Sequence, residues 1–434
     1  MRLTFLTGER KISNLAVAIV SFLAAIAATL LVLNFSAAEK HVREKVPKLY
    51  GTSDPQFLRA MGTLLGPAIV PGNKVETLLN GDQIFPPMLA AIQGARTSIT
   101  FETYIYWSGD IGQAFADALA ERAKAGVKVH VLLDWVGSAK MDDALLDEMR
   151  DAGVQIRKFH KPHWYTLGRL NNRTHRKLLV VDGRIGFTGG VGIAPNWTGA
   201  AQDADHWRDT HYRVEGPVVA QMQATFLDNW MKVEGEVLHG DTYFPKLAPA
   251  GNAAAQMFSS SPTSGSENMQ LMYHMAIAAA DTRIDLAMAY FVPDDMSLEL
   301  LSDALRRGVK VRIITPGPIT DSETVRSASK AQWGDLLRAG AEIYEFQPTM
   351  YHCKVMVVDG LLSSVGSTNF DPRSFRLNDE ANLNVYDSEF AARQQADFGD
   401  DLKKSRRYTL EEWEQRPYTQ RMKEWASSLL RSQL

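Results

Sequence analysis

The pattern His-x-Lys-x-x-x-x-Asp occurs twice in this chain of 434 residues, at 175–182 and at 352–359. In both copies a glycine lies seven positions beyond the aspartate. The motif residues are His175, Lys177 and Asp182 in the first copy and His352, Lys354 and Asp359 in the second. One such octapeptide is weak evidence, but two copies in register predict a fold built from two equivalent halves.

The sequence around each motif repeats as well. Runs rich in β-branched and aromatic residues at 98–106 and 283–291 are followed by amphipathic segments that end at Gly126 and Gly308. Glycine is the expected terminator of a helix. The following segments correspond in pairs: strands at 127–133 and 309–314, helices that end at Gly153 and Gly340, and short strands at 154–159 and 342–346. Strands alternating with helices predict βαβ units and a largely parallel sheet.

The length exceeds the size at which one hydrophobic core usually stops growing, so two packed domains are expected. Composition shifts divide the chain further. The predicted units are a tail and transmembrane helix (1–38), a juxtamembrane connector (39–74), a first domain (75–244), an Ala/Ser/Gly/Pro-rich connector (245–267), a second domain (268–402) and a basic amphipathic tail (403–434).

The N-terminal region predicts a membrane anchor. Residues 12–38 contain no charge and 15–33 are almost wholly apolar, which is enough helix to cross about 30 Å of hydrocarbon. A cleavable signal peptide is the alternative, because Ser36, Ala37 and Ala38 resemble a cleavage site. Basic residues flank the span on both sides, so the positive-inside rule does not orient it.

The stretch from residue 403 carries eight Lys/Arg against four Glu. Its apolar residues predict one face on short helices separated at Pro417. They are Leu410, Trp413, Trp425, Leu429 and Leu430. This face either contacts a membrane surface or packs onto the second domain.

Charge and cysteine content exclude some classes of protein. The net charge of −3 shows no basic excess for a nucleic-acid backbone, and nucleic acid is therefore not an expected partner. With one cysteine, Cys353, neither an intramolecular disulfide nor a four-cysteine zinc site is possible. Side chains two apart on a strand share a face, so Cys353 points away from His352 and Lys354 and is expected to fill the core.

The paired motifs fit the chemistry of a phosphodiester. Lys177 and Lys354 neutralise the non-bridging oxygens, one histidine attacks phosphorus, and the other protonates the leaving oxygen. This scheme needs neither a metal nor another cofactor, and the sequence contains no metal-binding motif.

Further residues are predicted to complete this site. The glycine turns permit close approach of backbone to phosphate, which makes Gly190, Ser367 and Asn369 candidate phosphate ligands. A catalytic imidazole needs a carboxylate on its second nitrogen, and Asp209 and Glu380 lie downstream of the two motifs. Asp182 and Asp359 are included among the catalytic-motif residues, although their place at the far end of the strand favours turn capping. Candidate pocket walls, with core packing as the alternative, are Tyr104, Tyr106, Trp107, Tyr290 and Phe291.

The doubled His-Lys-Asp motif resembles that of the phospholipase D superfamily, over about residues 76–400. Within it, the phrases YIYWSGDIG, THRKLLVVDGRIGFTGG, HWRDTHYRVEGP and GSTNFDPRSFRLNDEAN resemble bacterial cardiolipin synthases. The resemblance implies two pseudo-symmetric α/β/α sandwich domains around one active site. It also implies condensation of two phosphatidylglycerols to cardiolipin and glycerol through a phosphatidyl-histidine.

The resemblance further implies that His175 is the nucleophile and His352 the acid, with Lys177, Lys354 and Asn369 on phosphate. Asp209 and Glu380 would orient the histidines. Phospholipids and a membrane, here the cell inner membrane, are the implied partners, and no obligatory protein partner is evident. The alternatives are a phospholipase D that forms phosphatidic acid, or a membrane-tethered nuclease of the same fold.

The chain departs from the family pattern in two respects. Gly192 stands at the position in the first half that Asn369 holds in the second, so the site is expected to lack one side-chain donor there. One predicted span replaces the hairpin of two that relatives often carry.

Overall fold

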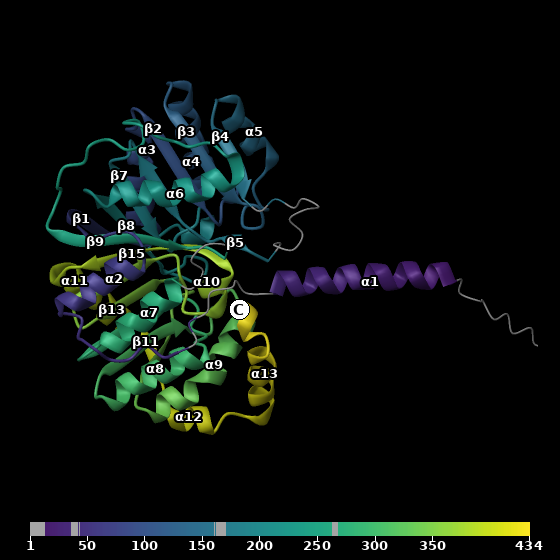
Figure 1. Ribbon diagram of the computed structural model, residues 1–434, viewed down its shortest axis with the longest axis vertical. Helices are drawn as coiled ribbons and strands as arrows, with labels where there is room; N and C mark the ends of the chain where they lie inside the picture. The colour runs from purple at the N-terminus through teal and green to yellow at the C-terminus, as the bar shows by residue number, and fades with distance from the viewer. Residues whose placement is uncertain (1–13, 36–41, 43, 160, 162–170, 263–267) are drawn as a thin grey trace, which may run out of the picture.

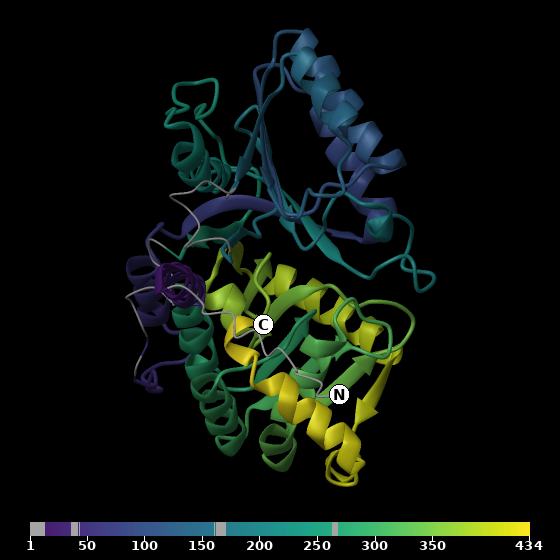
Figure 2. The same cartoon turned by 90° about the vertical axis from the view of Figure 1, so that its right-hand side faces the viewer.

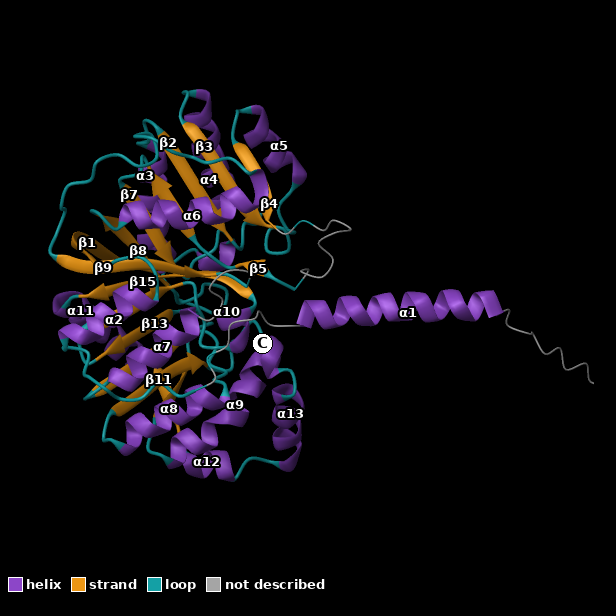
Figure 3. Ribbon diagram, viewed as in Figure 1, coloured by secondary structure: helices purple, strands orange, loops and turns teal. Residues whose placement is uncertain are grey.

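A computed structural model describes residues 14–35, 42, 44–159, 161, 171–262 and 268–434. Its strands join into one 16-stranded sheet that runs through both halves of the chain (Figures 1 and 3). In the first half the strand order is β4-β3-β2-β6-β7-β8-β1, and in the second it is β12-β11-β10-β13-β14-β15-β9. The two orders correspond strand for strand, and the predicted pseudo-symmetry is confirmed. The halves meet where β1 pairs antiparallel with β9.

The strands of the first half are β1 (Val70–Leu79), β2 (Ser98–Thr103), β3 (Lys128–Asp134), β4 (Gln155–Phe159), β5 (Arg173–Thr174), β6 (Leu178–Val181), β7 (Ile185–Gly189) and β8 (Thr210–Glu215). Those of the second half are β9 (Ala253–Ser260), β10 (Arg283–Met288), β11 (Lys310–Pro316), β12 (Glu342–Phe346), β13 (Lys354–Val358), β14 (Leu362–Gly366), β15 (Asn378–Tyr386) and β16 (Ser405–Tyr408).

The prediction of a largely parallel sheet is wrong. The βαβ part of each half is parallel, β2-β3-β4 and β10-β11-β12, and the short β5 also pairs parallel with β15. The strands after it, β6-β7-β8 and β13-β14-β15, pair antiparallel. The turns between β6 and β7 and between β13 and β14 are too short for a crossover helix, so the chain must reverse direction there.

Helices cover both faces of the sheet, which confirms the α/β/α sandwich in each half. The helices are α2 (Pro55–Leu64), α3 (Asn80–Gln93), α4 (Asp110–Lys124), α5 (Asp143–Asp151), α6 (Val219–Glu234), α7 (Asn268–Ala279), α8 (Asp295–Arg306), α9 (Glu323–Arg338), α10 (Pro372–Arg376), α11 (Ser388–Lys403), α12 (Leu410–Glu414) and α13 (Tyr418–Ser428). One apolar core lies under α3, α4 and α5 and another under α7, α8 and α9. A third joins α6 and α11 across the middle of the sheet.

The four predicted helix ends are confirmed. Gly126, Gly153, Gly308 and Gly340 each follow a helix with φ between 90° and 99°. This left-handed conformation favours glycine, and it turns the chain from each helix into the next strand.

The segments predicted as connectors contribute more to the fold than expected. Within 245–267, residues 253–260 form β9, which pairs with both β1 and β15. Within 39–74, α2 buries Phe57 and Met61 in the core of the second half, and β1 already begins at Val70. The polar, proline-containing composition of 39–74 and the Ala/Ser/Gly/Pro-rich composition of 245–267 predict connectors, but pairing between distant strands recruits part of each into the sheet.

The first part of the C-terminal stretch packs onto the second half, which is one of the two alternatives that the sequence predicts for it. Strand β16 pairs antiparallel with β12. Leu410 and Trp413 lie against the core under α9, and the Trp413 indole Nε1 donates to the Lys330 carbonyl at 2.9 Å.

Helix α1 (Asn14–Phe35) stands apart from the body of the molecule (Figure 1). Residues 16–33 have a mean hydropathy of 2.7 and none of them is buried. The chain therefore has one N-terminal helix, among the described residues, that is long and apolar enough to cross a membrane. The alternative cleavage site at 36–38 lies outside the described residues.

Candidate active site

The two motif histidines occupy equivalent places where the halves meet. His175 follows β5 and its backbone N–H donates to the Asp379 carbonyl at 2.8 Å. His352 precedes β13 and its backbone N–H donates to the Arg208 carbonyl at 2.7 Å. Each histidine is thus fixed through its main chain to the opposite half, which requires both halves to be folded and docked.

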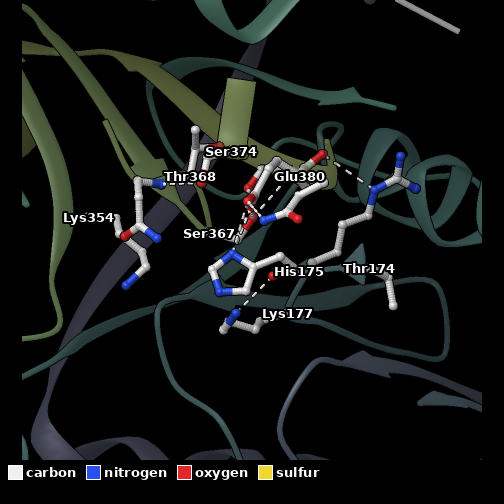
Figure 4. Close-up of polar contacts among 12 residues, drawn as sticks. Thr174, His175, Lys177, Lys354, Ser367, Thr368, Ser374 and Glu380 are labelled. Carbon is white, nitrogen blue, oxygen red and sulfur yellow. Dashed lines mark hydrogen bonds and ion pairs between the residues drawn. The ribbon is translucent and has the colours of Figure 1, made fainter. Parts of the chain in front are cut away.

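The predicted carboxylates contact the histidines, and they do so across the two halves. His175 Nδ1 lies 3.0 Å from both carboxylate oxygens of Glu380, from the second half (Figure 4). His352 Nδ1 lies 2.7 Å from Oδ2 of Asp209, from the first half. The remaining nitrogen of each ring, Nε2, is therefore the one available to a substrate.

Both carboxylates are completely buried and are held by further donors. Ser367 Oγ donates to Glu380 at 2.5 Å and Asn378 Nδ2 donates at 3.1 Å (Figure 4). For Asp209, the donors are the Trp197 indole N–H at 2.9 Å and the Thr210 backbone N–H at 2.8 Å. These donors favour the ionised carboxylates in an interior where an unpaired charge would be unstable.

The two lysines of the motifs lie beside the histidines. Each ammonium donates to the main-chain carbonyl of its own histidine at 2.8 Å, Lys177 to His175 and Lys354 to His352. The Lys354 ammonium also lies 3.2 Å from both ring nitrogens of His352. A phosphate placed between the imidazoles would accept hydrogen bonds from both ammonium groups.

Burial and like charge set the protonation of this cluster. Burial lowers the pKa of His175 to about 4, although Glu380 opposes the shift. Burial lowers the pKa of His352 as well, aided by the Lys354 ammonium. Burial and the nearby Lys354 lower the pKa of Lys177 to about 7. Burial would raise the carboxyl pKa of Glu380, but its contact with His175, the charge of Lys177 and the hydrogen bond from Ser367 outweigh burial and hold that pKa below its usual range. At neutral pH the empty site therefore holds a neutral His175 and an ionised Glu380, the state needed for an imidazole nucleophile.

A pocket of about 680 Å³ opens onto both histidines and is lined by both halves. Its lining carries four cations against two carboxylates: Lys140, Arg173, Lys177 and Arg373, with Asp321 and Asp371. Aromatic and aliphatic side chains also line it: Tyr104, Trp107, Val136, Trp197, Trp207, Tyr290, Val325 and Leu434. A pocket with an excess of cations and a large apolar share suits an amphipathic ligand with an anionic headgroup.

Of the three residues predicted to bind phosphate, one lines the pocket and two do not. Asn369 lines the pocket, and its buried Oδ1 has no hydrogen-bond partner within the described residues. Ser367 and Gly190 do not line it, and their backbone N–H groups donate to Ala381 and Thr210 in the sheet. Their prediction as phosphate ligands is wrong. A Cβ at position 190 would lie 2.2 Å from Oδ1 of Asp209, so this glycine makes room for the carboxylate.

Asp182 and Asp359 lie outside the pocket, and their inclusion among the catalytic residues is corrected. The Asp182 carboxylate accepts from the backbone N–H groups of Arg96, Thr97 and Ser98. Asp359 accepts from residues 281–283 in the equivalent way. Both aspartates have φ near +54°, at the turn that follows each motif strand. They tie that turn to the start of β2 or β10, which is the turn-capping role that their position favoured.

The five aromatic residues predicted as pocket walls also fall into two groups. Tyr104, Trp107 and Tyr290 line the pocket, whereas Tyr106 and Phe291 are buried in the two cores. Cys353 is buried, as expected, and burial raises the pKa of its thiol to about 12.

Sequence reasoning missed several pocket residues. The rings of Trp197 and Trp207 lie 5.2 and 5.4 Å from the His352 ring. Arg173 and Arg373 also line the pocket. The signal available was proximity to the repeat: Arg173 lies two residues before His175, and Arg373 lies four residues after Asn369. Asn196, which the sequence offers as a substitute for the asparagine that Gly192 replaces, lines the pocket as well.

Two α/β/α halves that share one pocket, each with a His-Lys pair, define a protein of the phospholipase D-like class. Comparison with solved structures finds the same fold. The structure of phosphatidylserine synthase from Haemophilus influenzae Rd KW20 superposes with a TM-score of 0.68 at 14% identity, over 87% of this chain and 100% of that one. A polyphosphate kinase from Porphyromonas gingivalis has the same fold in part, with a TM-score of 0.54 over 86% of this chain and 53% of that one, at 12% identity.

Sequence comparison narrows the class to a family. The model described as "Cardiolipin synthase, PLD-like domain" matches residues 88–230 and 273–402. The major cardiolipin synthase ClsA of Bacillus subtilis is 36% identical over 82% of this chain and 75% of its own length. Cardiolipin synthase A of Pseudomonas syringae is 34% identical over 82% and 74%. The chain belongs to the cardiolipin synthase family of phospholipase D-like proteins.

The lysine pKa predicts the alkaline limit of activity. Lys177 is protonated below about pH 7 and loses its charge as the pH rises through that value. We expect kcat/KM, which reports the free enzyme, to fall above about pH 7. In Lys177→Arg the group stays charged, so the fall should move to higher pH even if the absolute rate is lower. If kcat/KM of Lys177→Arg fell at the same pH as that of the unsubstituted enzyme, the fall would be due to a group other than Lys177.

Proposed function

We propose that this protein is a phosphatidyltransferase that condenses two phosphatidylglycerols into cardiolipin and glycerol. The observation that carries the proposal is the pair of buried histidines, each bonded through Nδ1 to a carboxylate of the other half, on one pocket in a chain of the cardiolipin synthase family. Two imidazoles that each turn Nε2 away from their carboxylate suit a reaction with a leaving alcohol and an incoming alcohol.

In the first step, Nε2 of His175 attacks the phosphorus of one phosphatidylglycerol. The bond from phosphorus to the headgroup glycerol breaks, and the glycerol oxygen takes a proton from His352. In the second step, the terminal hydroxyl of another phosphatidylglycerol gives its proton to His352 and attacks the phosphatidyl-histidine. The N–P bond breaks, cardiolipin leaves, and both histidines return to their starting states.

The lysines and Asn369 bind the phosphate oxygens through both steps. Burial lowers the pKa of both lysines, and the nearby Lys354 ammonium lowers the pKa of Lys177 further. An anionic phosphodiester relieves this repulsion, restores the lysine charge and raises the pKa of His352 toward the protonated form that the first step needs. Substrate binding therefore prepares the acid.

The pocket supports a lipid rather than a nucleic acid. Its walls are aromatic and aliphatic, and the chain as a whole has a net charge of −3. A strand of nucleic acid needs an extended cationic groove for successive phosphates, whereas a phospholipid needs one anion site under an apolar wall. We infer that α1 anchors the enzyme in the cell inner membrane, where such a substrate resides.

The test is incubation of the detergent-purified full chain with phosphatidylglycerol labelled in the headgroup and in an acyl chain. We expect cardiolipin and free glycerol in equal amounts, because each transfer releases one headgroup. Phosphatidic acid alone would make water the acceptor and the enzyme a hydrolase. If no lipid product formed, hydrolysis of bis(p-nitrophenyl) phosphate would place the substrate outside this lipid class.

A further inference from the structure

Helix α13 carries its large apolar side chains on the outside of the molecule. Tyr418, Met422, Trp425 and Leu429 are spaced by four, three and four residues, which places them on one face of the helix. Their exposed fractions lie between 45% and 74%, and Leu430 beside them is 53% exposed. The usual pattern of a surface helix, with its apolar side inward, is reversed here.

The polar side of α13 fixes this orientation. Glu424 is buried and pairs with Arg416 at 2.9 Å. The Arg416 guanidinium lies over the Trp413 ring, 3.7 Å from its centroid, and Trp413 in turn is bonded to α9. Because this ion pair and stacked arginine hold the inner face, turning the apolar stripe inward would break buried contacts. The exposed stripe is a stable feature of the fold.

The chain continues from the stripe into the active-site pocket. After Leu430 the chain reaches Gln433 and Leu434, and both line the pocket. Arg373 holds them there, because its backbone N–H donates to the Leu434 carbonyl at 3.1 Å and its Nε donates to the Gln433 carbonyl at 2.9 Å. The last residues of the chain thus connect the outer face of α13 to the pocket, with Leu434 as the apolar residue at the pocket end.

We propose that the outer face of α13 lies in the surface of an anionic phospholipid bilayer and passes lipid substrate along the stripe into the pocket. In Figure 1, α13 lies on the side from which α1 projects, and Figure 2 shows it in front when that side faces the viewer. The stretch 403–434 carries eight Lys/Arg against four Glu, which favours an anionic surface. Exposed Arg421 and Lys423 lie within the same helix.

A bilayer is the occupant that these observations favour over a protein partner. The apolar stripe is narrow and lies next to a pocket whose lining combines apolar side chains with an excess of cations, the two kinds of contact that a phospholipid needs for its acyl chains and its headgroup. This inference rests on the proposed function only in taking a bilayer lipid as the substrate. The position of α13 in a membrane can be measured whether or not cardiolipin forms.

The depth of α13 is measured with a fluorescent label in the full chain. Cys353 is 1% exposed, so Met422→Cys supplies the reactive thiol. Met231→Cys on α6 is the matched control, since Met231 is 41% and Met422 45% exposed. After reconstitution into vesicles of phosphatidylglycerol and phosphatidylethanolamine, brominated acyl chains should quench the label at 422 and leave the label at 231 unaffected. Equal quenching at the two positions, or none at either, would overturn the proposal.

Turnover supplies the second readout. Trp425→Ser with Leu429→Ser should lower kcat/KM on vesicle phosphatidylglycerol roughly tenfold or more, because two apolar anchors leave the membrane. With monomeric dihexanoyl phosphatidylglycerol, which needs no membrane surface, kcat/KM should not change. The matched double variant Met231→Ser with Val237→Ser removes two exposed apolar side chains elsewhere and should change neither rate.

The outcomes separate this proposal from the proposed function. Quenching at 422 in an enzyme that makes no cardiolipin supports docking and refutes the transferase. Cardiolipin synthesis with no quenching, and with equal vesicle rates in both double variants, supports the transferase and refutes docking. Equal losses on vesicle and monomeric lipid would place the effect of the α13 substitutions in the fold and would also overturn the docking proposal.

Discussion

His175→Ala and His352→Ala each reduce turnover of phosphatidylglycerol to background. The two imidazoles supply the nucleophile and the proton for the leaving oxygen, and they are the only imidazoles among the described residues that line the pocket. Loss of the acid alone costs about 10²- to 10⁴-fold, and loss of the nucleophile removes the covalent route. The measurement is the initial rate of cardiolipin formation, with thermal unfolding as a control for folding.

A trapping experiment distinguishes the two roles. With a phosphatidyl p-nitrophenol labelled at phosphorus, the leaving group departs without a proton. His352→Ala should then accumulate label on the protein, because His175 still attacks but no base activates the acceptor. His175→Ala should accumulate none. The label should be stable to alkali and labile to acid, as a phosphorus–nitrogen bond requires. The reverse pattern would make His352 the nucleophile.

The effects of the two substitutions should not add. Each histidine acts in both steps, so the double variant should be no slower than the slower single variant. Additive losses would indicate two independent sites, one for each half. That result would contradict a single shared pocket.

The sequence predicted the repeat unit of this fold well, because the signals for it are local. Glycines at 126, 153, 308 and 340 end helices whatever the rest of the chain does. The alternation of β-branched runs with amphipathic segments predicted the βαβ part of each half. It did not reveal the antiparallel strands that follow, since the direction in which a buried strand pairs depends on contacts between distant residues.

The sequence predicted which residues form the site better than it predicted how these residues contact one another. His175, Lys177 and His352 line one pocket, Lys354 contacts the His352 ring, and Asp209 and Glu380 contact the imidazoles. The sequence did not show that each carboxylate crosses to the histidine of the other half, because that follows from how the halves dock at β1 and β9. Ser367 was assigned to phosphate from its place in a glycine turn, but its hydroxyl faces inward to Glu380.

Glu380→Gln lowers kcat by about 10⁴-fold while the protein stays folded. Glu380 gives both oxygens to His175, and it also accepts from Ser367 and Asn378. A glutamine has one oxygen, so its NH₂ must face one of these donors or the imidazole N–H. The negative charge that stabilises the positive phosphatidyl-imidazole is lost in either orientation. Replacing the buried carboxylate that orients a catalytic histidine by its amide lowers kcat by this order of magnitude.

The control is Glu345→Gln. Glu345 is also buried and ion-paired, to Lys330, Arg326 and Arg406, but it lies outside the pocket. Its substitution should lower the melting temperature and leave the kcat of the folded enzyme unchanged. The same loss of kcat in both variants would show that Glu380 acts through stability alone.

The crossed arrangement makes Asp209→Asn a separate test of the order of steps. If His175 is the nucleophile, Glu380→Gln slows formation of the labelled intermediate from the p-nitrophenol substrate. Asp209→Asn weakens His352, which this substrate does not need until the acceptor arrives, so formation stays fast and release becomes slow. Label should therefore accumulate in Asp209→Asn and not in Glu380→Gln. Because each carboxylate comes from the half that its histidine does not, this opposite behaviour would also establish that one catalytic cycle uses both halves of the chain.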